Sequence, residues 1–432
     1  MAGRSVDRRD GGLILAIFLM PTTWVQSRRN PHTAIPQILD TALRAEAAKF
    51  HAVFLPDSWE LRRDWGPVGF QSLEPIGLLN YVAAHTDNIG LIATVSTTWS
   101  QPYNLARQFA TLDLLSDGRA GWNIVTSVTG ATNFGVQQPS HAERYRRAHE
   151  FVTVVDRLWD SWGAESIQFS EDGRAHVDAA HIHPIDHSAE HFTVAGPLNI
   201  PRTPQVRPLH VQAGASQHGI ELAAQHAELV FTAQPFDDVA KNFRLTLHEA
   251  FRNTGRTCVP PRVLTGVRPI IAATRDEAEE KLRRQLDNQS AQHVLVRYES
   301  AIGRSLSEFP LDDVLPIDLV DAVDTDGWNG NQSFYEITRR HIASGITLRQ
   351  LLTTDQHWRI VGSPGDIADR LSERFDNDAT DGYNLIVNDP ESFELFLGEV
   401  IPELQRRGLF RTDYSGRTFR EDIAAAGRPP LW

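Results

Sequence analysis

Small, polar and acidic residues lie within or directly after four short apolar runs of this 432-residue sequence. These residues are Asp57, Thr94, Asn123 and the turn formed by Gly214, Ala215 and Ser216. If the runs are parallel strands, their carboxyl ends lie at one edge of the sheet, which is where α/β folds bind ligands. Ordinary strand-to-helix turns and helix caps also have this composition, so both interpretations stay open for any single residue.

The turn Ala213-Gly214-Ala215-Ser216 indicates an anion site. Gly214 and Ala215 let a ligand approach the backbone closely, and Ser216 is placed to cap the amphipathic helix predicted over 216–226. The start of a helix offers free N–H groups and the positive end of the helix dipole. A phosphate group suits such a terminus.

The segment HAERYRRAHEF at 141–151 opens another predicted helix, at 141–162. His141 and Tyr145 are four residues apart and therefore share one helix face. Tyr145 has a hydroxyl for a phosphate, and the three arginines of this segment, at positions 144, 146 and 147, add positive charge. A surface helix with solvated arginines is the competing interpretation.

The segment HIHPIDH at 181–187, with His191 beyond it, has the composition of a metal cluster. Histidine is the commonest metal ligand. However, His181, His183 and His187 lie in a stretch between predicted elements, whereas barrel metalloenzymes carry such a pair at a strand end. We therefore expect no metal site.

The sequence contains no nucleophile elbow, no P-loop and no Gly-x-Gly-x-x-Gly fingerprint. Its acidic residues also show no pairing that would identify a glycosidase. The absence of acid–base machinery suggests that a cofactor carries the reaction.

The elements that would position these residues alternate between strand and helix. The apolar runs lie at 13–20, 52–56, 89–95, 122–126, 208–213, 229–233, 262–272 and 383–387. The helical stretches lie at 36–50, 75–86, 103–115, 141–162, 216–226, 236–253, 365–375 and 391–407. Eight alternations predict a (β/α)₈ TIM barrel, with an open doubly wound sheet as the rival. We expect a single barrel domain over 1–432, with insertions at about 164–207 and 286–360.

Composition narrows the class of protein. The formal charge of −13 argues against a nucleic-acid binder. The apolar run at 13–20 is far shorter than the ~20 residues of a membrane helix. No cleavage site follows it, so we interpret it as a buried first strand rather than a signal peptide. A single cysteine, Cys258, fits a reducing compartment, and we expect a cytoplasmic protein.

Longer stretches carry a specific resemblance. They are 116–135 (SDGRAGWNIVTSVTGATNFG), 141–162, 183–216, 230–234, 373–387 and 401–421. Together they closely resemble the nitrilotriacetate, pristinamycin and dibenzothiophene-sulfone monooxygenase branch of the bacterial luciferase-like superfamily. The resemblance implies a (β/α)₈ barrel that uses FMNH₂ from a separate flavin reductase, and O₂. One oxygen atom would reach an organic small molecule through a flavin C4a-peroxy species.

The resemblance also implies site residues. Asp57 and Thr94 match positions that line the flavin, and Asn123 matches the position beside the isoalloxazine. His141 and Tyr145 match a pair that contacts FMN, and Ala215 and Ser216 match the phosphate-binding turn. His141 is the candidate for moving a proton. The resemblance further implies a homo-oligomer, a dimer or a tetramer.

Three segments depart from the family pattern, at 21–33, 58–74 and 286–360, and these would cover the substrate side, so the substrate stays open. Three other functions also stay open. One is a deazaflavin-dependent dehydrogenase of the same superfamily, one is a barrel metallohydrolase, and one is a non-catalytic flavin-binding protein.

Overall fold

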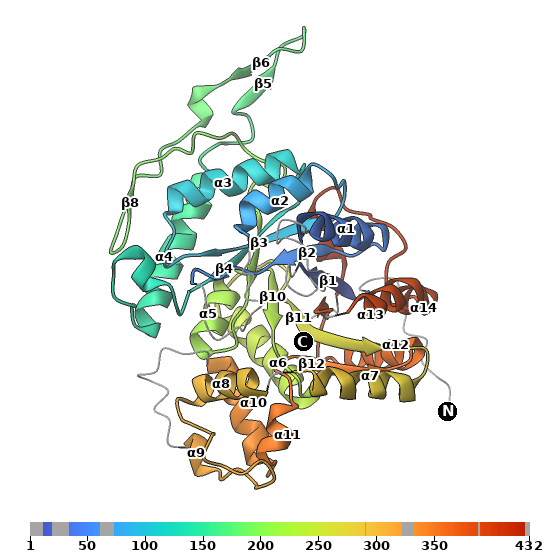
Figure 1. Ribbon diagram of the computed structural model, residues 1–432. Helices are drawn as coiled ribbons and strands as arrows, with labels where there is room; N and C mark the ends of the chain where they lie inside the picture. Colours follow the sequence, from blue (N-terminus) through green and yellow to red (C-terminus); the bar gives the residue numbers. More distant parts are fainter. Residues whose placement is uncertain are drawn as a thin grey trace.

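The computed structural model describes residues 12–19, 34–60, 73–289, 291–321, 332–387 and 389–427 (Figure 1). Two of the segments assigned above to the substrate side, 21–33 and most of 58–74, therefore lie outside the described residues.

Eight parallel strands close into a barrel, which confirms the predicted fold and excludes an open sheet. In order around the ring they are β1 (Ile14–Phe18), β2 (Ala52–Leu55), β3 (Gly90–Ser96), β4 (Ala120–Val125), β9 (Leu209–Gln212), β10 (Leu229–Thr232), β11 (Arg262–Ile271) and β13 (Gly382–Leu385). The ring closes because β10 pairs with β11, β11 with β13, and β13 with β1. The strands are short apolar runs because helices cover their outer faces.

Helices surround the barrel (Figure 1). They are α1 (Ala34–Ala47), α2 (Pro75–Ala83), α3 (Pro102–Leu115), α4 (His141–Trp159), α5 (Gln217–His226), α6 (Asp237–Asn253), α7 (Arg275–Asp287), α12 (Pro364–Asp376), α13 (Pro390–Leu395) and α14 (Ile401–Arg406). A π-helical turn, η5 (Phe396–Val400), joins α13 to α14. The single helix predicted over 391–407 is therefore interrupted. Pro402 in the first turn of α14 explains the break, because proline has no N–H to continue the regular ladder.

A ninth strand, β12 (Trp358–Gly362), extends the sheet beside the second half of β11. This strand was not predicted from the sequence, and its first residues fall within the insertion expected at about 286–360. In β12 the residues alternate between buried and half-buried, so the strand lacks the continuous apolar run that marks the barrel strands. Helix α7 was not predicted either, because Ala278 is its one fully buried residue and the helix shows no apolar stripe.

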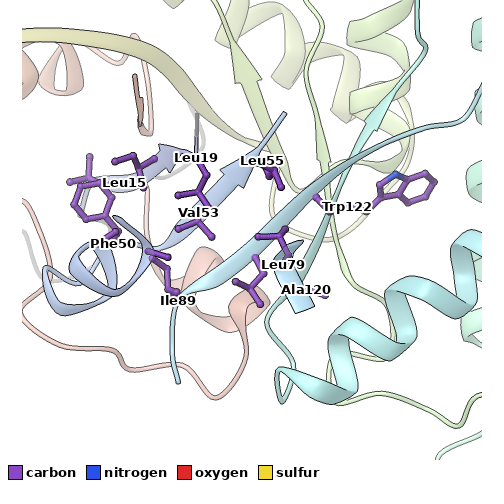
Figure 2. Close-up of a cluster of buried hydrophobic side chains, with 14 of the residues drawn as sticks. Leu15, Leu19, Phe50, Val53, Leu55, Leu79, Ile89, Ala120 and Trp122 are labelled. Carbon is purple, nitrogen blue, oxygen red and sulfur yellow. The ribbon is translucent and has the colours of Figure 1, made fainter. Parts of the chain in front are cut away.

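The main hydrophobic core lies between the outer faces of the strands and the helices (Figure 2). Its members include Leu15, Val53, Leu79, Ile89 and Trp122. Each such side chain contributes about 1.5–3 kcal/mol through burial. A second cluster fills the barrel interior, and α15 (Phe419–Ala425) closes its amino-terminal end. A Cβ on Gly90 would lie 2.4 Å from the Phe419 ring, so glycine makes room for this plug.

The two long stretches lie between barrel elements. The first carries the hairpins β5–β6 (Ile167–Phe169, Ala175–Val177) and β7–β8 (His187–Ser188, Thr193–Val194), with the 3₁₀ turn η4 (Ala179–His181) between them. Figure 1 shows β5–β6 extending away from the barrel. The second carries α8 (Ala291–Ile302), α9 (Asp318–Asp321), α10 (Gln332–Ala343) and α11 (Leu348–Leu352), which pack around their own apolar cluster. This arrangement supports the proposal that both are insertions into one barrel unit.

Within the described ranges, every helix is too short or too polar to cross a membrane.

Candidate active site

The turn between β9 and α5 forms the start of a helix with free backbone N–H groups. Ser216 caps α5, as predicted, and its Oγ accepts a hydrogen bond from the Gly219 N–H at 3.2 Å. A Cβ on Gly214 would lie 2.7 Å from Gln212 Nε2 and 3.5 Å from the Tyr145 hydroxyl. Glycine therefore keeps this turn open next to two polar side chains.

Three rings from two helices gather beside this turn. His141 and Tyr145 lie in the first turns of α4, which Ser140 caps, and their ring centroids are 4.8 Å apart. His218, in the first turn of α5, lies 5.2 Å from His141 and 5.6 Å from Tyr145. His218 is not among the site residues predicted from the sequence. Its position two residues after a predicted helix cap is the signal that would have found it.

His141, Tyr145 and the β9–α5 turn line a cavity of about 160 Å³ at the carboxyl end of the barrel, whereas His218 lines the larger cavity next to it. The lining of the smaller cavity comes from the end of β4, the first turns of α4, the β9–α5 turn and the start of α10. Four of the predicted site residues line this cavity, namely His141, Tyr145, Ala215 and Ser216. It continues into the larger cavity of about 1020 Å³ between α5, α6 and α10.

The charge at this cavity is positive or neutral. The guanidinium of Arg144 lines it with a side chain that is 1% exposed, and its Nη1 donates to the Pro139 carbonyl at 2.8 Å. Burial lowers the pKa of Arg144, but a guanidinium still carries its charge at neutral pH. Burial, then Arg144 and His218, also lower the pKa of His141, so its imidazole is neutral at pH 7.

The other two arginines of this helix have different contacts. The Arg147 guanidinium lies 4.4 Å from the Phe192 ring centroid, and its Nε donates to the Thr97 carbonyl. Arg146 forms an ion pair with Glu143. Of the three predicted cations, Arg144 is the one that lines the cavity.

Thr94 and Asn123 form a second polar group on neighbouring strands. They are paired in register on β3 and β4, and Asn123 Nδ2 donates to Thr94 Oγ1 at 2.9 Å. Both residues are buried, and Asn123 Oδ1 has no hydrogen-bond partner among the described residues. Asn123 and Val125 share one face of β4, and Val125 lines the cavity. The face of β4 that carries Val125 therefore leads from the cavity to this pair.

Asp57 follows β2 at the same end of the barrel. Its Oδ1 accepts a hydrogen bond from the Ser58 N–H at 2.8 Å, and the residue is half-buried. It does not line either of the two cavities described here.

An aromatic cluster covers the loops after β2, β3 and β4. The Trp99 and Phe134 rings stack at 5.1 Å, and Trp59 lies 5.3 Å from Phe134. Phe134 belongs to the 3₁₀ turn η3 (Ala131–Phe134), which follows Gly130 at a φ of +100°. This cluster was missed, because its contacts join loops that are far apart in sequence.

The histidines of the segment 181–191 contact different carboxylates in the structure. His181 contacts Asp178 at 3.1 Å, and His187 contacts Glu150 at 3.0 Å. In the described part of the chain, one group has metal-compatible spacing, and it combines His191 with Glu143 and Glu190. Arg146 contacts both of these carboxylates and supplies a positive charge there.

Comparison with known proteins identifies relatives. A sequence profile described as luciferase-like monooxygenase matches residues 15–380. The N-acetyl-S-(2-succino)cysteine monooxygenase of Bacillus subtilis (strain 168) is 37% identical over 394 residues, or 88% of each chain. The nitrilotriacetate monooxygenase component A of Aminobacter aminovorans is 40% identical over 372 residues, which cover 82% of this chain and 79% of the relative.

Two solved structures superpose on this chain over most of its length. A riboflavin lyase crystallised with modified FMN and riboflavin superposes with a TM-score of 0.82 at 26% identity, over 96% of both chains. An F420-dependent secondary alcohol dehydrogenase superposes with a TM-score of 0.59 at 16% identity, over 90% of this chain and 98% of the other. The second likeness shows the fold alone.

Proposed function

The chain belongs to the luciferase-like monooxygenase family, and from this premise we propose that it is a two-component, FMN-dependent monooxygenase. In this proposal a separate NAD(P)H:flavin reductase supplies reduced FMN, and the chain uses it with O₂ to oxygenate a small organic molecule. The name of the Aminobacter relative, a component A, supports the division into two components.

The observation that carries the proposal is the anion site between α4 and α5. The capped start of α5 offers N–H groups and the positive end of its dipole to the FMN phosphate. Gly214 lets the phosphate approach the backbone, and the Tyr145 hydroxyl lies beside the same turn. The buried guanidinium of Arg144 adds positive charge. These residues fit a dianionic phosphate.

In this proposal the rest of the flavin lies along the inward face of β4. A ligand whose phosphate lies at Ser216 would reach Thr94 and Asn123 with its ring. The free Oδ1 of Asn123 would accept a hydrogen bond from an N–H of a polar heterocycle. Asp57 would approach the same ring from the end of β2.

Bound reduced FMN supplies the activation of O₂ and the transfer of one oxygen atom to the substrate. The chain binds the phosphate, orients the ring and excludes water from the reacting face. The apolar surface of Trp59, Trp99 and Phe134 supports this exclusion at the rim. The neutral imidazole of His141 is placed to accept a proton on a ring nitrogen near the phosphate end.

The alternative of a deazaflavin-dependent dehydrogenase has weaker support than the monooxygenase, because the F420-dependent enzyme is similar to this chain in fold alone. The monooxygenase relatives are far more similar in sequence. A metallohydrolase gains no support from the contacts at the cavity, and the relatives, which are named monooxygenases, favour an enzyme over a non-catalytic flavin binder. We also propose that the chain assembles as a homo-oligomer.

The proposal is tested by reconstitution under ¹⁸O₂. The purified chain would be incubated with FMN, NADH and a panel of the compounds on which its relatives act, with and without a flavin reductase. We expect one ¹⁸O atom in a product, by mass spectrometry, when the reductase is present. The sequence lacks a dinucleotide fingerprint, so the pure chain should not oxidise NADH. Rapid NADH oxidation by the chain alone would overturn the two-component proposal.

A further inference from the structure

We propose that Asn384 and His357 form a subsite that holds an uncharged hydrogen-bonding group of the substrate, beside a wall of phenylalanine rings. This inference rests on the proposed function, because it places the substrate on the side of the barrel mouth that the bound flavin would not occupy. The strand order defines that side. The phosphate site and the Thr94–Asn123 pair lie on β3, β4 and β9, and across the ring from these strands lie β11, β13 and β1.

Asn384 points into the barrel from β13. Its neighbour Tyr383 points outward, because the Tyr383 hydroxyl donates to the Leu371 carbonyl of α12. Side chains alternate along a strand, so Asn384 faces inward. Its register partners are two small residues, Ala16 and Gly266. The side chain is fully buried, yet neither Nδ2 nor Oδ1 has a hydrogen-bond partner among the described residues.

A buried amide in this state is unfavourable for the fold. An unsatisfied buried donor or acceptor costs about 1–3 kcal/mol. Polar groups that persist at such a cost are typical of binding sites, where a ligand provides the missing partner. Asn384 supplies both a donor and an acceptor, which matches groups such as amides, hydroxyls, carbonyls and sulfones.

His357 reaches the same place from the segment that precedes β12. A Cβ on Gly266 would lie 2.5 Å from His357 Nδ1, so the imidazole occupies the space in front of this glycine. Nδ1 has no hydrogen-bond partner in the described part of the chain. Burial is the main cause that lowers the pKa of His357 to about 4, and the ring is therefore neutral at pH 7.

Three phenylalanines adjoin this polar pair. The Phe18 ring lies 4.9 Å from Phe54 and 5.0 Å from Phe231, and Phe231 lies 5.9 Å from His357. They come from β1, β2 and β10, and Phe54 is fully buried within the barrel. Such a wall favours an apolar or aromatic substrate body.

The two polar groups of the subsite carry no charge at neutral pH, and the charges around them are three arginines and one carboxylate. The Asp355 carboxylate lies 3.3 Å from Arg268 and 3.2 Å from Arg359, so these cations already hold a carboxylate. Asp355 also opposes the effect of Arg268 and Arg297 on the His357 ring. Because Asn384 and His357 are uncharged and the wall beside them is apolar, we assign the subsite to a compact neutral molecule with one polar group, rather than to a polycarboxylate.

The test compares benzamide with benzoate, two probes of similar shape that differ in charge. Binding to the FMN-supplemented chain would be measured by ligand-observed NMR, for the wild type, Asn384→Leu and His357→Gln. We expect benzamide to bind at least ~10-fold more tightly than benzoate. Asn384→Leu should weaken benzamide by about 10-fold, which corresponds to one lost hydrogen bond. His357→Gln keeps a neutral donor and acceptor and should lose less.

A stability measurement separates a ligand subsite from a structural amide. Asn384→Leu removes unsatisfied atoms and should leave the Tm unchanged or raise it by ~1–4 °C. Thr380→Val is the matched control. Thr380 precedes the same strand, is fully buried and has its Oγ1 hydrogen-bonded to Val263 and Gly382, so its loss should lower the Tm.

The subsite is refuted if benzamide does not bind, if benzoate binds as well, or if Asn384→Leu lowers the Tm as Thr380→Val does. FMN titration of the same proteins keeps this outcome separate from the proposed function. Tight FMN binding without discrimination between the probes would refute the subsite alone. If the wild type does not bind FMN, the proposed function itself is refuted.

Discussion

Replacing Ser216 with aspartate should abolish tight FMN binding without harming the fold. Aspartate caps helices as well as serine does, so the bond from the Gly219 N–H should survive in Ser216→Asp. The new carboxylate, however, would face the FMN phosphate at the helix start that otherwise attracts it. It would also compete with the phosphate for the same N–H groups.

The magnitude follows from the position of Ser216. Two unit charges about 4 Å apart interact with about 4 kcal/mol at the effective dielectric constant of a partly buried site. Ser216 is half-buried, so solvent screens part of this repulsion. We therefore expect a loss of about 2–4 kcal/mol, or a ~30- to 1000-fold weaker Kd for FMN.

Fluorescence titration with FMN and with riboflavin provides the assay. Riboflavin has no phosphate, and its affinity should hardly change. Ser216→Asn is the matched control, since asparagine also caps the helix but adds no charge, and it should cost less than about 10-fold. Equal losses for FMN and riboflavin in Ser216→Asp would show that the phosphate does not bind at this turn, and the reasoning would fail.

Three further predictions concern the hydroxyl, the metal and the pH dependence. Tyr145→Phe should weaken FMN binding by about 1–2 kcal/mol in the same titration and leave riboflavin unaffected, and an unchanged FMN Kd would remove Tyr145 from the site. Activity should survive dialysis against EDTA, with no stoichiometric zinc or iron by elemental analysis, whereas one metal per chain with activity lost on its removal would contradict this. Burial lowers the pKa of His226 to about 3 and of His248 to about 4, below the ordinary 6.5. The unfolded chain binds these protons first, so the free energy of unfolding should fall as the pH drops from 6.5 toward 4. Urea unfolding at several pH values measures this, and a flat profile would contradict it.

Much of the barrel was predictable because its strands are continuous apolar runs. Strands such as β3 are buried on both faces, and this leaves a strong local signal in the sequence. The missed strand β12 is buried on one side only, and its Arg359 interrupts the apolar pattern. Helix α7 is polar on nearly every face, so its sequence shows no periodicity that predicts packing.

The site was predictable where local chemistry marks it. Ser216 follows a strand and caps a helix, and His141 and Tyr145 are spaced for one helix face. Contacts between distant segments left no such signal. The Trp99–Phe134 stack joins two loops. The His357 ring lies against Gly266 in space, and this contact depends on how β11 pairs with its neighbours. Which residues face into the barrel becomes clear only once the register is known.

The central claim is that this chain binds reduced FMN. An anaerobic titration of the purified chain with photoreduced FMN, and in parallel with reduced F420, tests it most directly. We predict saturable binding of one reduced FMN per chain and much weaker binding of F420, with the FMN preference reduced in Ser216→Asp. Saturable binding of reduced F420 without binding of reduced FMN would contradict the account.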